Sequence, residues 1–165
     1  MNETANREPG AGDGQFLAMQ QRVKGSNIDE TTLLATDYLN HFNEIVMMPD
    51  MPDMLEEVKA WQPKSYTDHF KDSTIADKDL AIEAYDHVPG IYREPFEQTI
   101  EQINLMIAST VERLETNIRD GQDDVLRANV QTLSGILQRL MDTASAIIHG
   151  SAKTMDQSEI DQLLG

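Results

Sequence analysis

Cysteine is the first absence in this chain of 165 residues, which contains none at all. A chain without cysteine has no disulfide framework, no thiolate metal site and no cysteine nucleophile. Basic side chains are also scarce, because 13 Lys and Arg stand against 29 Asp and Glu, for a formal net charge of -16. A chain this negative repels nucleic acid and anionic membranes, so we expect neither as a partner.

Long hydrophobic runs are missing as well. No stretch approaches the roughly 18 apolar residues of a transmembrane helix, so membrane insertion is not expected. The start of the chain, MNETANREPGAGDGQ, has no apolar run of the kind found in a signal peptide. We therefore expect a cytoplasmic protein. Neither a Gly-rich phosphate loop nor a GxSxG or HExxH motif occurs, so no cofactor is predicted.

Apolar residues recur at helical spacing along the chain, and no segment shows the alternation that is typical of a strand. A first helix is predicted from about Asp29 to Pro49, with Leu34, Tyr38 and Phe42 on one face. Two longer helices are predicted over residues 94–118, with Pro95 near the start, and 125–149. The second of them has an apolar row with steps of 4, 3, 4, 3, 4 and 3, which are typical of a coiled-coil seam. This row consists of Leu126, Val130, Leu133, Leu137, Leu140, Ala144 and Ile147.

These helices predict an all-α fold. A turn around Gly121 joins the two long segments, so we expect a long antiparallel helical hairpin. Two helices bury only one seam, so the hairpin is expected to be completed in one of two ways. Either the shorter helices pack on it, or two hairpins pair in a homodimer as a four-helix bundle.

Composition divides the chain into four parts. Residues 1–26 are rich in Gly, Asn, Gln and charge, so we expect a mostly disordered N-terminal tail with at most one short amphipathic turn. Residues 27–149 are predicted to form the helical bundle domain, and 150–154 a short polar linker. Residues 155–165 form a separate C-terminal segment. The region 54–95 contains the single Trp and three of the four Tyr, and the sequence predicts no role for it.

The C-terminal segment has apolar and acidic residues in a distinctive arrangement. DQSEIDQLLG resembles the amino-terminal peptide of the flagellar switch protein FliM, of the type SQ-x-EIDALL, and the acidic C-terminal segment of the chemotaxis phosphatase CheZ. The resemblance implies a regulator of bacterial chemotaxis or flagellar motility that docks a CheY-like receiver of two-component signalling. The alternative is a structural or adaptor bundle whose terminal turn packs on itself. The implied partner-binding residues are Glu159, Ile160, Asp161, Leu163 and Leu164.

A weaker resemblance lies on the last long helix. QTLSGILQRLMD, residues 131–142, is similar to the active helix of CheZ, with QDLTG followed by KRMMD, once a gap of one residue is allowed. It implies that Gln131 is the catalytic position of a phosphatase acting on a receiver aspartyl phosphate. A side-chain amide both donates and accepts hydrogen bonds, so it can orient water for in-line attack. The alternative is that Gln131 is an ordinary polar residue beside the seam, and whether the chain is an enzyme stays open. Gly135 in this stretch either permits close helix approach or is simply tolerated.

Two sets of carboxylates and histidines have the spacing of one helical turn. They are Asp37, His41 and Glu44, and the pair Glu83 and His87. Neither set gives the Glu-x-x-His motif of carboxylate-bridged di-iron bundles. Solvated or capping roles are the interpretation that we favour, so no metal site is predicted.

Overall fold

The computed structural model describes residues 11–46 and 59–151. No β-strand occurs in these two ranges, where the only β-type pairing is an isolated antiparallel bridge between Ile28 and Ala35. The all-α class is therefore confirmed for the described part of the chain. Its elements are α1 (Ala11–Val23), the 3₁₀ helix η2 (Thr36–Leu39), α2 (Asn40–Val46), α4 (Tyr66–Lys71), α5 (Lys78–Tyr85), α6 (Gly90–Arg119) and α7 (Asp123–Ile148).

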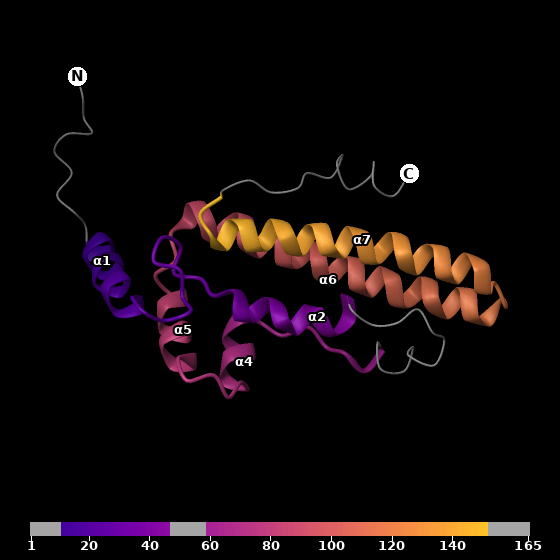
Figure 1. The fold of residues 1–165 in the computed structure, drawn as a ribbon, viewed down its shortest axis with the longest axis horizontal. Helices are drawn as coiled ribbons and strands as arrows, with labels where there is room; N and C mark the ends of the chain where they lie inside the picture. The colour runs from indigo at the N-terminus through magenta and orange to yellow at the C-terminus, as the bar shows by residue number, and fades with distance from the viewer. Residues whose placement is uncertain (1–10, 47–58, 152–165) are drawn as a thin grey trace, which may run out of the picture.

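The two longest helices, α6 and α7, lie side by side and run in opposite directions (Figure 1). Between them the chain turns at Gly121, whose positive φ of 66° suits glycine because it has no Cβ. The amide of Gln122 donates a hydrogen bond of 2.9 Å to the carbonyl oxygen of Asn117 and closes this turn. The last five residues of the seven-residue row predicted on α7 are buried: Leu133, Leu137, Leu140, Ala144 and Ile147.

Helix α6 begins at Gly90, several residues before the start that was predicted near Pro95. The carbonyl oxygen of Pro89 accepts hydrogen bonds from the amides of Tyr92 and Arg93, both at 2.9 Å, and so opens the helix. An ion pair of 3.1 Å between Arg93 and Glu97 then spans the turn in which Pro95 lies. Pro95 consequently lies inside the helix, and the earlier prediction of its position was wrong.

The first helix differs more strongly from its prediction, because residues 27–35 form a loop. The side chain of Asp29 accepts hydrogen bonds from the amides of Thr31 and Thr32, and this local turn competes with a helix. Leu33 adopts a positive φ of 65°, which no α-helix contains. Helical structure starts only at Thr36 and becomes α-helical at Asn40.

Helix α1 lies in a segment that was predicted as part of a mostly disordered tail. Met19 and Val23 of this helix are buried, at 3 % and 0 % exposure. Arg22 pairs with Glu83 of α5 through two hydrogen bonds of 2.5 and 2.8 Å. The prediction was therefore wrong for residues 11–23, because two apolar anchors and one ion pair fix a helix of low overall hydrophobicity. Residues 1–10 lie outside the described ranges.

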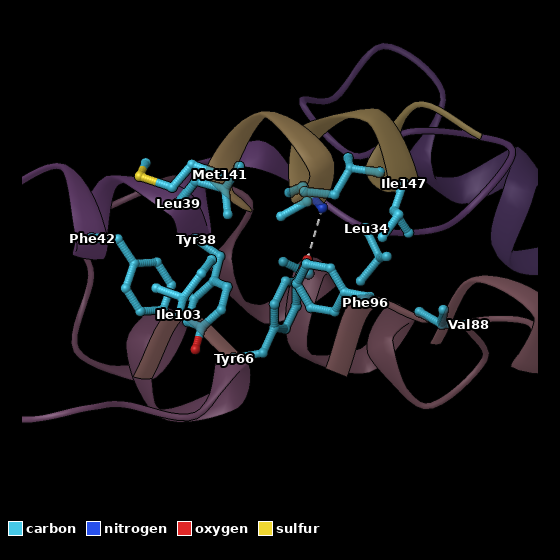
Figure 2. Close-up of a cluster of buried hydrophobic side chains, with 14 of the residues drawn as sticks. Leu34, Tyr38, Leu39, Phe42, Tyr66, Val88, Phe96, Ile103, Met141 and Ile147 are labelled. Carbon is cyan, nitrogen blue, oxygen red and sulfur yellow. Dashed lines mark hydrogen bonds between the residues drawn. The ribbon is translucent and has the colours of Figure 1, made fainter. Parts of the chain in front are cut away.

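The hydrophobic core lies where η2, α2, α4 and α5 meet the N-terminal half of α6 and the C-terminal half of α7. Figure 2 shows Tyr38, Tyr66 and Phe96 together in this cluster, with Phe42 and Ile103 beside them. Leu34, Tyr38 and Phe42 are at most 1 % exposed, so the residues predicted for the apolar face of the first helix do form core. Their side chains reach the core from a loop, a 3₁₀ helix and a short α-helix in turn.

Candidate functional site

The predicted catalytic residue Gln131 lies on α7 with an exposed side chain. It is followed on the same face by Gly135, Gln138 and Asp142, at steps of four, three and four residues, and all of these positions are exposed. We refer to these four residues as the α7 polar stripe. Leu133 of the neighbouring face is 1 % exposed, so the stripe borders the buried seam without being part of it.

One hydrogen bond orders the stripe near its end. Nε2 of Gln138 donates to Oδ1 of Asp142 over 3.1 Å. This i, i+4 pair can be read from the sequence once α7 is known, yet no family pattern pointed to it. It leaves Oε1 of Gln138 as an acceptor for another group.

A polar cavity of about 250 Å³ lies beside the Gln138–Asp142 pair. It is formed where η2 and α2 approach α7, and Asp37, Asn40 and Asn43 contribute from that side. Asp37 and Gln138 are 101 positions apart along the chain, so no local sequence pattern indicates that they lie close together. The cavity offers carboxylate, amide and hydroxyl groups to a polar ligand or to a partner's surface.

The remaining predicted site residues are not brought together. The partner-binding residues 159–164 lie outside the described ranges, so their placement stays a prediction. Glu83 pairs with Arg22, and the ring of His41 stacks on Trp61 at 4.6 Å between ring centroids. In the described part of the chain, no three His, Asp or Glu side chains gather as a metal ion would require.

A cluster of aromatic and imidazole rings forms the second feature of the molecule that could carry function. Residues 59–65 run along this cluster; 59 and 60 are helical, and 61–65 have no regular secondary structure. We call this segment the strap. Nε1 of Trp61 donates to the carbonyl oxygen of His41 over 3.1 Å, and the hydroxyl of Tyr38 donates to the carbonyl oxygen of Lys64 over 2.5 Å. The amide of Lys64 donates to Nε2 of His41 over 3.2 Å. The strap is thus fastened to η2 and α2 by three hydrogen bonds.

Burial changes the ionisation of the rings in this cluster. It raises the pKa of Tyr38 to about 12, and it also raises the pKa of Tyr66, so both phenols stay neutral near pH 7. Burial lowers the pKa of His69 below its ordinary value of 6.5, although the neighbouring Asp37 acts in the opposite direction. Burial therefore favours the neutral forms of Tyr38, Tyr66 and His69.

Two cavities lie between the strap and α6. One, of about 270 Å³, is bounded by Tyr66, Phe96 and Ile100, and the other, of about 340 Å³, by Trp61, Ile107 and Val111. Pro63 of the strap and Asn104 of α6 line both cavities. Oδ1 of Asn104 is buried and accepts no hydrogen bond within the described residues.

Comparison with known proteins gives no relative from which a site could be transferred. The chain matches no protein-family model, no curated protein and no solved structure. None of the helices in residues 11–46 and 59–151 is both long and apolar enough to cross a membrane.

Proposed function

We propose that the chain is a regulator of bacterial chemotaxis or flagellar motility that docks a CheY-like receiver through its EIDQLL segment. The observation that carries this proposal is the sequence DQSEIDQLLG, which resembles the receiver-binding peptides of FliM and CheZ. Ile160, Leu163 and Leu164 would supply apolar anchors in a groove, while Glu159 and Asp161 would steer the encounter. Such a peptide pays an ordering cost on binding, so we expect modest affinity.

We further propose that the docked receiver is presented to α7 and loses its phosphoryl group there. The exposure of Gln131 supports this step, because a side chain that enters another protein's active site must first be free of its own core. An amide placed near the aspartyl phosphate would hold a water in line with the phosphorus, and the receiver would provide the rest of the machinery. A tether at the chain end would raise the local receiver concentration near α7.

The C-terminal part of α6 and the N-terminal part of α7, on either side of the turn at Gly121, support a homodimer with a four-helix bundle. Leu114, Ile118 and Val130 of the predicted seams are only half-buried, and Val125 is 46 % exposed. A second hairpin packed on this end would cover them, as in other four-helix bundles. Sedimentation equilibrium should then give twice the chain mass, and Val125→Glu should shift the equilibrium to monomer. A monomer at all accessible concentrations would remove the dimer from the proposal.

The docking step is tested by titrating a labelled peptide of residues 151–165 against CheY-like receivers, with and without the phosphate mimic beryllofluoride. We expect micromolar binding that tightens with the mimic, and loss of binding for the double substitution Leu163→Ala, Leu164→Ala. If the peptide bound none of the receivers, the docking proposal would be overturned. The structural alternative predicts instead that deletion of residues 155–165 lowers the melting temperature of the full chain by several degrees.

The dephosphorylation step is tested separately, with the full chain and phosphorylated receiver. Gln131→Ala should reduce the rate enhancement by at least about tenfold, since positioning groups contribute on this scale. Gln98→Ala serves as the matched control, because Gln98 is an exposed glutamine of α6 away from α7's polar stripe. Full activity of Gln131→Ala would exclude the catalytic role proposed for Gln131. If Gln138→Ala lost activity while Gln131→Ala kept it, Gln138 would be the catalytic glutamine instead.

A further inference from the structure

The imidazole of His41 holds the strap only in its neutral form. Its Nε2 accepts the hydrogen bond from the amide of Lys64, and its ring stacks on Trp61 with an interplanar angle of 24°. An imidazolium carries N–H groups on both nitrogens and cannot accept a hydrogen bond. Protonation of His41 would therefore turn an N–H donor toward the N–H of Lys64.

A second histidine lies close to the first. The rings of His41 and His69 are 6.0 Å apart between centroids, and His69 also meets the edge of Tyr38 at 5.5 Å. Because His69 is partly buried, its charged form is penalised. If both imidazoles took up protons, two positive charges would lie on rings whose centroids are 6.0 Å apart and would repel each other.

Other charged groups lie around His69. Asp37 of η2 and Asp72 after α4 favour the charged form of His69, whereas Lys64 of the strap disfavours it. Asp72 is itself paired with Nζ of Lys64 at 3.1 Å, so part of its charge is already matched. Tyr38 remains neutral throughout the range in which histidines titrate. The two histidines therefore lie beside a strap that carries Lys64 and is held in part by the hydrogen bond to the imidazole of His41.

We propose that the strap, residues 59–65, is a pH-sensitive latch that His41 and His69 keep closed when neutral and release when they become protonated in mild acid. Release would separate Trp61 and Pro63 from α6 and join the two cavities on either side of Asn104 into one open groove. That groove would present Ile100, Ile107 and Val111, together with the unsatisfied Oδ1 of Asn104. Lys59 of the strap also pairs with Glu115 of α6 at 3.2 Å, a partly exposed ion pair that release would have to break. The latch includes no residue of the receiver-docking segment.

Trp61 is the only tryptophan of the chain, so its fluorescence reports on the strap directly. In the full-length protein we expect its emission to move to longer wavelength, and its quenching by acrylamide to rise, between about pH 7 and pH 5, the range in which histidines take up protons. The far-UV circular dichroism should stay constant over this range, because the helices do not depend on the strap. Unchanged emission, or a shift that coincides with loss of helix, would overturn the proposal. A fall in intensity without a shift or added quenching would do so too, because it would report protonation with the strap closed.

Two substitutions assign the effect to the latch. Glutamine can place an acceptor near the position of Nε2 but does not titrate, so His41→Gln should abolish the pH-dependent shift. His149→Gln is the matched control, because His149 is exposed at the end of α7 and pairs with Asp29, so the shift should persist. An unaltered shift in His41→Gln would exclude the histidine mechanism. Hydrogen exchange of the wild-type chain tests the latch without any substitution. After correction for intrinsic exchange rates, the amide of Lys64 should lose protection at low pH, while the amide of Ile107 keeps it. Equal protection of the Lys64 amide at both pH values would contradict the latch.

Discussion

The hydroxyl of Thr32 donates a hydrogen bond of 2.6 Å to the carbonyl oxygen of Ile148, joining the loop before η2 to the last turn of α7. Both residues are buried, at 0 % and 1 % exposure. The carbonyl oxygens of a last helical turn have no partner within their own helix, so this one is satisfied from 116 residues away. The same hydroxyl accepts from the amide of Leu34 at 3.3 Å, which ties the loop's irregular backbone to the helix end.

The first prediction concerns this hydrogen bond. Thr32→Val keeps the shape of the side chain but removes the hydroxyl, so two buried backbone groups lose their partner. We expect the free energy of unfolding to fall by about 1–3 kcal/mol, the usual cost of an unsatisfied buried group. Urea denaturation followed by circular dichroism measures it. Thr32→Ser retains the hydroxyl and should lose clearly less, and equal losses in both variants would show that the methyl group matters instead.

The second prediction concerns Tyr66. Its hydroxyl oxygen accepts a hydrogen bond of 2.9 Å from the amide of Ala35, which is 1 % exposed. Tyr66→Phe leaves that amide unsatisfied, so we expect a loss of about 1–3 kcal/mol in the free energy of unfolding. Tyr85→Phe is the control, since the hydroxyl of Tyr85 donates only to the exposed carboxylate of Glu97. A loss in Tyr85→Phe as large as in Tyr66→Phe would contradict this assignment.

The third prediction is a loss of stability in alkali. Burial raises the pKa of Tyr38 to about 12 in the folded chain, from an ordinary value of 10.0. The unfolded chain therefore releases this proton first, so the contribution of Tyr38 is complete below pH 10.0 and disappears as the pH rises toward 12. Between these values the loss is up to about 1.4 kcal/mol per pH unit for each such tyrosine. Urea midpoints at a series of alkaline pH values measure the slope.

Tyr38→Phe separates this effect from general alkaline unfolding. The variant loses the hydrogen bond to the carbonyl oxygen of Lys64, so we expect it to be less stable than the wild type at neutral pH. Its stability should nevertheless fall less steeply with pH, because one shifted phenol is gone. A slope equal to that of the wild type would show that Tyr38 does not ionise on unfolding in this range.

Burial along α7 was predictable from the sequence, because it follows from periodicity alone. Leu133, Leu137 and Leu140 recur at heptad spacing, and the one glycine inside the helix that carries them, Gly135, does not interrupt it. The loop at 27–35 was not predictable in the same way. Its apolar spacing fits a helix, but the side chain of Asp29 accepts hydrogen bonds from two backbone amides. Leu33 also adopts a positive φ, which a leucine in the sequence does not predict.

The candidate site was predictable only where it lies within one helix. Gln131 and Gln138 share a face of α7 because of their spacing, which the sequence contains. The strap depends on contacts between His41 and Trp61, twenty positions apart, in a region rich in turn residues. Their stacking arises from how the strap packs against α2, and no local sequence pattern records that arrangement.

The fourth prediction concerns Gly121, in the turn between α6 and α7. Its φ of 66° lies in the left-handed region, and a Cβ added there would have no atom within 4 Å. The cost of Gly121→Ala therefore comes from the backbone alone, and we expect a loss of about 1–2 kcal/mol in the free energy of unfolding. Gly121→Asn should lose less, since asparagine tolerates this conformation. A neutral Gly121→Ala would mean that the turn changes its conformation without penalty.

The fifth prediction is that Gly135→Ala stabilises the fold. Gly135 lies inside α7 with an exposed surface, and a Cβ added there would have no atom within 4 Å. Glycine costs a helix about 1 kcal/mol relative to alanine, so we expect a gain of about that size in the free energy of unfolding. Close approach of another helix in the same chain would give a loss instead, as would a second chain packed on this position. Since Gly135 lies between Gln131 and Gln138 on the α7 polar stripe, a variant that is more stable but slower in receiver dephosphorylation would locate the proposed contact at this stripe.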